Sequence, residues 1–204
     1  MQVESSVRPP RSDRADLWTV IVVGAAVALC TVGFAGIRLG GILPNSAVDV
    51  LVPFIDTTAS VPIGPGGTGL DVAVGQGILT ASGLPGAVLA FLALAVVVEA
   101  VTTLTIVGCL GILCVNLMKG RAFSPTNTRL VIVSAIVLVA GTAVGALFQT
   151  LGANGALAAV SDGSFDGVVA SGSLVPYLVA TGLAAVAVAF KAGERLQRET
   201  YGLV

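Results

Sequence analysis

Four long runs of the chain are almost continuously apolar, and polar residues gather between and beyond them. The runs cover 17–38, 86–117, 130–151 and 174–190. A helix that crosses a bilayer needs about 17–25 predominantly apolar residues, and all four runs meet that length. The pattern predicts an all-α integral membrane protein with four transmembrane helices.

The segment 39–85 carries a different pattern, in which apolar and polar residues alternate. Val48, Val50 and Val52 alternate with their neighbours, and a second alternating run follows at 70–74. A period of two with β-branched residues is typical of strands, and the glycine-rich tract 64–69 between the two runs is typical of a turn. The segment therefore predicts a small β-rich lobe, a hairpin with or without a third short strand. We expect it to pack on the helix ends or on the segment 152–173.

The remaining segments are short and more polar. We expect a disordered tail over 1–16, a loop over 118–129, a second loop over 152–173 and a tail over 191–204. Within the first loop, Ser124 followed by Pro125 is a helix-start signal. The second apolar run is longer than a hydrocarbon core of about 30 Å can hold. Its first two turns should therefore project beneath the β-rich lobe.

Basic residues distinguish the two sides of the predicted membrane protein. Nine of the ten fall in three clusters, namely Arg8, Arg11, Arg14, Lys119, Arg121, Arg129, Lys191, Arg195 and Arg198. These clusters lie before the first run, between the second and third, and after the fourth. Short loops rich in Lys and Arg stay in the cytoplasm. We therefore expect a multi-pass protein of the cell inner membrane with both termini cytoplasmic, and an extracytoplasmic β-rich lobe and 152–173 loop.

Composition argues against several classes of function. The chain is 55% hydrophobic and 10% charged and has no histidine, whereas a soluble domain carries about 25% charged residues. Histidine is the commonest metal ligand and general base, and no nucleophile stands near a base in the sequence. We expect no enzymatic activity, no cofactor and no metal site. The basic clusters lack interleaved aromatic residues, which argues against direct nucleic-acid binding.

One acidic residue, Glu99, lies within a predicted span. Thr102 and Thr103 follow three and four positions later, so the three side chains share a helix face, and we expect this polar stripe to point inward. An acid inside the membrane is costly and is a candidate functional site. Three interpretations stay open: a structural ion pair with Arg38, proton or ion handling, and contact with a partner.

Two small-residue spacings, Gly36–Gly40 and Gly141–Gly145, would allow helices to approach closely. Such spacings arise easily in a chain rich in glycine and alanine. They favour packing inside the helix bundle over dimerisation.

Two further segments carry a family resemblance. Residues 120–130 resemble a Gly-x-x-Phe-Ser/Thr-x-x-Asn-x-x-Leu motif at the start of a third helix, and residues 193–204 resemble a Gly-x-x-Leu-Gln-x-Glu ending. With its four-span topology, the chain resembles a bacterial family of four-helix membrane proteins, the domain of unknown function twenty-nine seventy-five. The resemblance implies four spans, cytoplasmic ends and no assigned reaction. Members are often encoded beside small helix-turn-helix regulators, which implies the membrane component of a sensing or regulatory pair.

We expect the residues of the two motifs to meet on one cytoplasmic face, where they either anchor helix ends or dock a partner. The candidates are Gly120, Phe123, Ser124, Asn127, Gly193, Leu196, Gln197 and Glu199. The sequence as a whole predicts a non-enzymatic sensor, regulatory or assembly subunit that acts in the lipid bilayer through a protein partner or a homo-oligomer. The alternative is a small transporter or channel subunit with Glu99 in a polar path.

Overall fold

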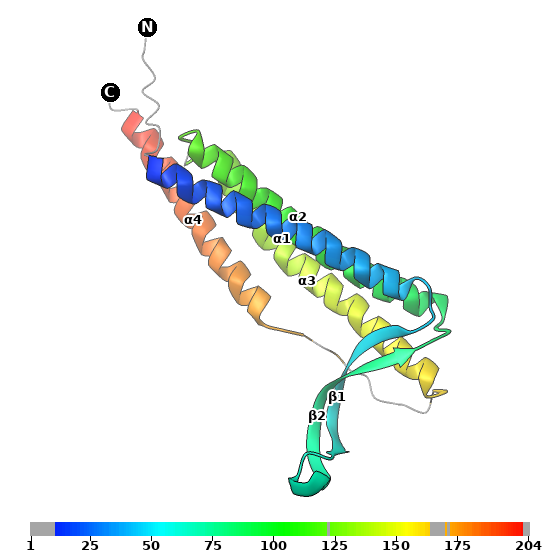
Figure 1. Cartoon of the computed structure of the whole chain (residues 1–204). Helices are drawn as coiled ribbons and strands as arrows, with labels where there is room; N and C mark the ends of the chain where they lie inside the picture. The colour runs from blue at the N-terminus through cyan, green and yellow to red at the C-terminus, as the bar shows by residue number, and fades with distance from the viewer. Residues whose placement is uncertain (1–10, 122, 164–169, 171, 202–204) are drawn as a thin grey trace. The chain divides into compact units, whose positions relative to one another are not determined.

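The fold consists of long helices and one β-hairpin. A computed structural model of the chain describes residues 11–121, 123–163, 170 and 172–201. The described elements are α1 (Arg11–Ile42), β1 (Val48–Val61), a short 3-10 turn (Pro65–Gly67), β2 (Leu70–Ala81), α2 (Gly86–Met118), α3 (Pro125–Val160) and α4 (Val175–Tyr201) (Figure 1). All four α-helices are long and apolar enough to cross a membrane. By length and composition, the helices thus agree with the prediction of a mostly helical, multi-pass membrane protein.

Three helices extend beyond the apolar runs that predicted them. α1 begins at Arg11, so the prediction of a disordered tail is wrong for residues 11–16, while 1–10 lie outside the described residues. α3 continues to Val160, so residues 152–160 are helix and not loop. α4 continues through the polar tail to Tyr201. A change from apolar to polar residues marks where a membrane could end, but alanine, arginine and glutamate there still favour helix.

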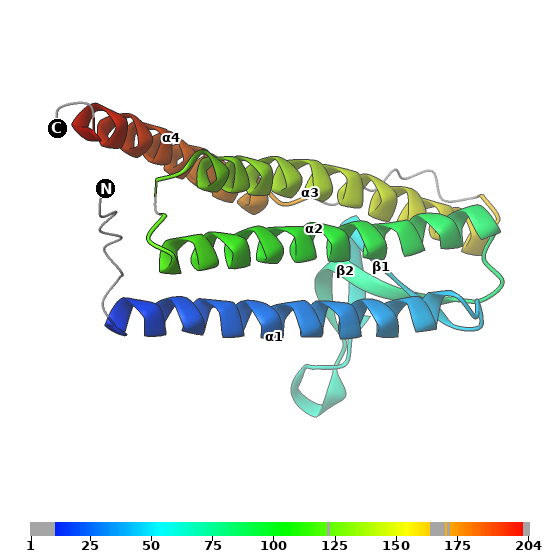
Figure 2. The same cartoon turned by 90° about the horizontal axis from the view of Figure 1, so that it is seen from above.

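The chain divides into two compact units, and α1, α2 and α3 each contribute to both. The first unit comprises 1–34, 99–143 and 173–204, and the second comprises 35–98 and 144–172. Within the first unit, the parts of α1, α2 and α3 run side by side (Figure 2). Nine of the ten basic residues belong to this unit, whereas the second unit has Arg38 and five aspartates. The division by contacts therefore coincides with a division by charge.

In the second unit, β1 and β2 form an antiparallel two-stranded sheet. Val48 pairs with Ala81 at the base of the hairpin, and Val61 pairs with Leu70 near its tip. The register shifts between Pro53 and Thr57, where three residues of β1 lie opposite one residue of β2. No third strand occurs among the residues that the structure describes. The bulge divides the hairpin into a basal half and a distal half, which we call the arm.

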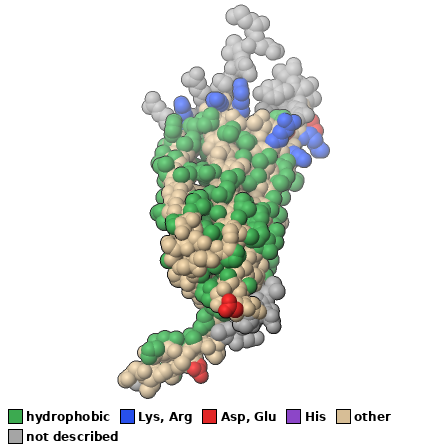
Figure 3. Space-filling model, turned by 90° about the vertical axis from the view of Figure 1, so that its right-hand side faces the viewer, with side chains coloured by type: hydrophobic (Ala, Val, Ile, Leu, Met, Phe, Trp, Pro, Cys, Tyr) green, Lys and Arg blue, Asp and Glu red, His purple; other side chains and the backbone are tan. Residues whose placement is uncertain are grey.

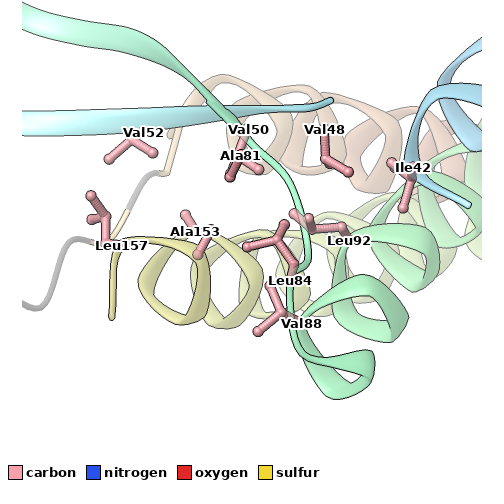
Figure 4. Packing of buried hydrophobic residues seen from close by; sticks show 11 residues of the cluster. Ile42, Val48, Val50, Val52, Ala81, Leu84, Val88, Leu92, Ala153 and Leu157 are labelled. Carbon is pink, nitrogen blue, oxygen red and sulfur yellow. The ribbon is translucent and has the colours of Figure 1, made fainter. Parts of the chain in front are cut away.

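The basal half of the hairpin packs on the helix ends of its own unit. Val48, Val50 and Val52 are buried against the first turns of α2 and the last turns of α3 (Figure 4). The helices α2 and α3 contribute Val88, Leu92, Ala153, Ala156 and Leu157 to this cluster, and Leu84 comes from the turn that precedes α2. The sequence-based expectation of packing on helix ends is confirmed. The first two turns of α2 contribute Val88 and Leu92 to this cluster. This agrees with the expectation that an apolar run longer than the bilayer core projects beneath the β-rich lobe.

Glycines let α3 approach α2 at this cluster. A Cβ atom built on Gly152 or Gly155 would lie within 3 Å of a side-chain carbon of Leu92 or Val88, respectively. Real Cβ atoms essentially never come so close. These glycines resemble loop residues in the sequence, but the fold uses them for close helix packing.

Asn45 ties together the two ends of the inserted hairpin. Its side-chain Oδ1 accepts a hydrogen bond from the Leu84 backbone N–H at 2.8 Å, and its Nδ2 donates to the Leu84 carbonyl at 3.0 Å. Its carbonyl accepts from the Gly83 N–H at 3.2 Å. Asn45 also has a φ of 51°, in the left-handed region that asparagine tolerates better than most residues.

We expect Asn45→Ala to lower the free energy of unfolding of the second unit by about 2 kcal/mol. Two side-chain hydrogen bonds are lost, at about 1 kcal/mol each, and alanine is strained at positive φ. Hydrogen exchange of the β1 and β2 amides measures the change. Ser46→Ala is the matched control, because Ser46 contributes only its carbonyl, which accepts from Ser82 Oγ. Equal exchange rates in the two variants would contradict the role given to Asn45.

Candidate functional site

The turn between α2 and α3 is built from the first motif. The Gly120 N–H donates to the Leu117 carbonyl at 2.9 Å, and the Arg121 N–H donates to the Asn116 carbonyl at 3.0 Å. This pair of bonds is a Schellman motif, which ends a helix with a residue at positive φ, and Gly120 has a φ of 74°. Ser124 then caps α3, since its Oγ accepts from the Asn127 N–H at 3.3 Å. The helix-start signal at Ser124-Pro125 is therefore correct.

Asn127 is the centre of a buried polar group that closes this turn. Its side chain is fully buried, with 0% exposure. Its Oδ1 accepts from Asn116 Nδ2 at 2.8 Å, and its Nδ2 donates to the Arg121 carbonyl at 2.7 Å. We call Asn116, Arg121, Ser124 and Asn127 the Asn127 cluster. The cluster joins the end of α2, the turn and the start of α3 through one side chain.

The second motif packs directly against the first. The Phe123 and Phe190 rings lie 5.9 Å apart, tilted by 56°, and a Cβ atom built on Gly193 would overlap the Phe123 ring. One residue further along α4, Glu194 Oε1 accepts from Thr128 Oγ1 at 2.5 Å. Within the first unit, Phe123 of the first motif and Gly193 of the second are thus brought together, and the assignment of this face to the cytoplasm stays a prediction. Close packing at Gly193 also explains why the second motif begins with glycine.

The other candidates of the second motif are Leu196, Gln197 and Glu199. Leu196 is exposed, and Glu199 forms an exposed ion pair with Arg195 at 3.3 Å. The side chain of Gln197 lies outside the described residues. Sequence reasoning missed Asn116, Thr128 and Glu194 as members of the site. The available signal was weak, because each is a single polar residue beside an apolar run.

We expect Gly193→Ala to lower the free energy of unfolding by about 1–3 kcal/mol, because the added methyl group must displace the Phe123 ring. Gly182→Ala on the same helix is the matched control, since no atom lies within 4 Å of its Cβ position. This control should stabilise the protein slightly through helix propensity. Thermal unfolding in detergent, followed by reaction of the buried thiols of Cys109 and Cys114, measures both. A similar midpoint for the two variants would contradict the packing argument.

The intramembrane polar residues are only partly brought together. Glu99 continues the side of α2 that buries Leu92 and Ala95, seven and four residues earlier, but Glu99 itself is exposed. Thr102 and Thr103 are half-buried. The expectation of an inward-pointing stripe is therefore wrong for Glu99 and correct for Thr102, which packs against Gly141 of α3. Arg38 is half-buried and belongs to the other unit, so its ion pair with Glu99 stays a prediction.

The two glycine spacings have different outcomes. A Cβ atom built on Gly141 would overlap the Thr102 side chain, and one on Gly145 would lie 3.8 Å from Val98 Cγ1. Packing of this pair inside the bundle is confirmed. Nothing in the described chain lies within 4 Å of the Cβ positions of Gly36 and Gly40, so the expectation of packing inside the bundle is wrong for that pair.

Exposed cations surround the motif contacts. Arg14, Lys119, Arg121, Arg129, Lys191 and Arg195 are all exposed. They gather where α1 begins, α2 ends, α3 begins and α4 ends (Figure 3). Among the described residues, no group of three His, Cys, Asp or Glu side chains could hold a metal ion.

No protein-family model matches this chain, and neither a curated protein nor a solved structure matches it. The family resemblance of the two motifs therefore stays a prediction.

Proposed function

We propose that the chain is a non-enzymatic, multi-pass protein of the cell inner membrane that acts as a sensor, regulatory or assembly subunit through a protein partner. The proposal places both termini and the Asn127 cluster in the cytoplasm and the hairpin outside. Its support is the distribution of charge, since the exposed cations gather around the motif contacts and the hairpin unit carries five of the seven aspartates. Cationic ends remain on the cytoplasmic side during insertion.

One observation carries the functional part of the proposal. α2 and α3 each hold the hairpin core at one end and the Asn127 cluster at the other. Two continuous helices thus connect a protruding β-hairpin to a turn that is closed by a buried amide. Among the residues that the structure describes, neither end offers a nucleophile beside a base, so the arrangement suits transmission or assembly better than chemistry. It also agrees with the pairing to a cytoplasmic regulator that the family resemblance implies.

The topology is tested by single introduced cysteines. Ile63→Cys lies near the hairpin tip and Thr126→Cys in the first turn of α3, and both positions are exposed. A membrane-impermeant maleimide should label Ile63→Cys in intact cells and Thr126→Cys only after permeabilisation. The wild-type chain, with Cys30, Cys109 and Cys114, measures background labelling. The opposite labelling pattern would overturn the proposed orientation.

The partner is tested by photocrosslinking in native membranes. A photoreactive residue at the exposed position Leu196 should give a reproducible protein adduct, because Leu196 belongs to the second motif. The same residue at Leu178, exposed within the apolar part of α4, is the control and should react with lipid. Absence of any protein adduct at Leu196 would count against action through a cytoplasmic partner.

A second candidate function is a small transporter or channel subunit. It is favoured by one observation, that Glu99 is exposed beside the half-buried Thr102 and Thr103. The proposal requires ion or solute flux in reconstituted vesicles that falls when Glu99 is replaced by Gln. Flux that is absent, or unchanged by Glu99→Gln, would remove this candidate.

A further inference from the structure

Basic residues line one side of the contact between α3 and α4 in the first unit. Thr128 and Glu194 face each other across this contact, since Thr128 Oγ1 donates to Glu194 Oε1 at 2.5 Å. The helices are antiparallel here, because α3 begins and α4 ends near the contact. In an antiparallel pair, the residues that directly follow the contact positions lie on the same side of the seam. Arg129 and Arg195 are those residues, and Lys191 lies one turn before Arg195 on the same side.

Two of these three cations have no acidic partner in the part of the chain that the structure describes. All three side chains are exposed. Arg195 pairs with Glu199 at 3.3 Å, whereas no ion pair among the described residues involves Arg129 or Lys191. The carboxylate of Glu194 accepts a hydrogen bond inside the seam. Arg129 and Lys191 therefore present two positive charges on the outside of the seam.

The same side of both helices continues as exposed apolar surface. Val133 and Ile136 follow Arg129 by four and seven residues, and Val188 precedes Lys191 by three, so each stays on the face of its cation. The side chains of Val133, Ile136 and Val188 are 42%, 61% and 67% exposed, respectively. Basic side chains at this end of the helices adjoin hydrophobic surface (Figure 3). We call six residues the basic flank: Arg129, Val133, Ile136, Val188, Lys191 and Arg195.

The order of the side chains along the basic flank selects the occupant. Both helices are apolar enough to cross a membrane, and the cations lie nearer to the helix ends than the apolar residues do. A phospholipid has the same order, with its phosphate at the membrane surface and its acyl chains beneath. Basic pockets between transmembrane helices bind anionic headgroups, and guanidinium groups donate paired hydrogen bonds to phosphate. An acidic soluble protein would match the cations but would leave the apolar residues uncovered.

We propose that the basic flank binds an anionic phospholipid, with the phosphate between Arg129 and Lys191 and the acyl chains along Val133, Ile136 and Val188. The proposal rests on the proposed function in one respect, because α3 and α4 must cross a bilayer. The bound lipid would bridge the two helices beside the seam in which the two motifs meet. The anionic lipid content of the membrane would then regulate how firmly the motifs hold together.

Lipid adducts of a photoreactive residue test the proposal. The full chain with this residue at Val188 is reconstituted in vesicles of equal parts phosphatidylcholine and phosphatidylglycerol, and mass spectrometry identifies the adducts. Leu178 is the control position, because it is exposed on the apolar part of the same helix, far from the cations. The ratio of phosphatidylglycerol to phosphatidylcholine adducts should be at least about tenfold higher at Val188, since each cation favours an anionic lipid by about fivefold.

Two matched pairs of substitutions locate the preference. Arg129→Gln with Lys191→Gln should lower the adduct ratio at Val188 to that at Leu178. Arg14→Gln with Lys119→Gln removes the same charge from the same unit but from outside the basic flank, and should preserve most of the ratio. All four substituted positions are exposed, so the core stays intact. An equal loss in the two pairs would overturn the proposal, because the preference would then come from general positive charge.

Two further measurements exclude other occupants of the basic flank. Inorganic phosphate, added at constant ionic strength, should leave the adduct ratio at Val188 unchanged. A loss of the preference would overturn the proposal in favour of a free anion. In native membranes, the photoreactive residue at Val188 should again give lipid adducts. A reproducible protein adduct in their place would overturn the proposal in favour of a protein partner.

The control position separates failure of this proposal from failure of the proposed function. If Leu178 reacts with lipid and the adduct ratios at Val188 and Leu178 are equal, α4 lies in the bilayer and only the lipid site fails. If Leu178 gives no lipid adduct, α4 does not contact the bilayer, and the proposed multi-pass topology itself fails.

Discussion

Asn127→Ala should lower the free energy of unfolding by about 2–4 kcal/mol. The substitution removes the side chain that satisfies Asn116 Nδ2 and the Arg121 carbonyl. Each buried polar group left without a partner costs about 1–3 kcal/mol, and alanine cannot replace either bond. The loss falls at the point where α2, the turn and α3 are joined. The expected result is a protein that still inserts in the membrane but has a looser α2–α3 turn.

The reaction of the buried Cys109 and Cys114 thiols with a thiol-reactive dye during heating measures the loss. A change of 1 kcal/mol shifts the midpoint of a chain of 150–250 residues by about 2–4 °C, so the expected shift is about 4–16 °C. Thr126→Ala is the matched control, because Thr126 is exposed in the same helical turn. A shift for Asn127→Ala no larger than that of the control would show that the buried amide is dispensable.

Val50→Asp should separate the hairpin from the helices at a cost of about 4 kcal/mol or more, since it places an unpaired carboxylate in an apolar core. Val50 is 1% exposed and packs among side chains from β2, α2 and α3. The charge cannot reach water while the hairpin stays docked. The expected result is a folded helical part with an undocked hairpin.

Hydrogen exchange of the amides of β1 and β2 measures this undocking, and their exchange should become much faster. Leu51→Asp is the matched control, because the next residue along β1 is partly exposed on the opposite face. It should leave exchange nearly unchanged in dilute detergent, where the protein is kept monomeric. Comparable exchange in Val50→Asp and wild type would contradict the assignment of Val50 to the core.

The predictable part of this fold is the part that hydropathy alone decides. Four apolar runs locate the four helices, and alternation at Val48, Val50 and Val52 locates a strand and its buried face. The ends of the helices were less predictable, because Gly152 and Gly155 resemble loop residues until Leu92 and Val88 are seen against them. Local sequence cannot show that a glycine is needed for the approach of another helix.

The candidate site was predictable in its membership but not in its contacts. Motif resemblance pointed to Phe123, Asn127 and Gly193, and the structure brings these segments together. Asn116 and Glu194 escaped notice because a hydrogen bond between side chains far apart in sequence leaves no periodic signal. For Glu99, the position along the chain was predictable, but the exposure of the side chain was not. Its position within an apolar run is evident, but its exposure depends on helices that lie elsewhere in the sequence.

The length of α2 gives the bilayer itself an influence on the hairpin. Its 33 residues span about 49 Å at 1.5 Å per residue, against a hydrocarbon core of about 30 Å. In the proposed topology, the turns with Val88 and Leu92 belong to the excess length, and these turns carry part of the hairpin core. Thicker lipid would compete with β1 for these turns, because hydrophobic mismatch favours covering apolar helix surface with acyl chains. We therefore expect lipids with longer acyl chains to weaken the docking of the hairpin on α2.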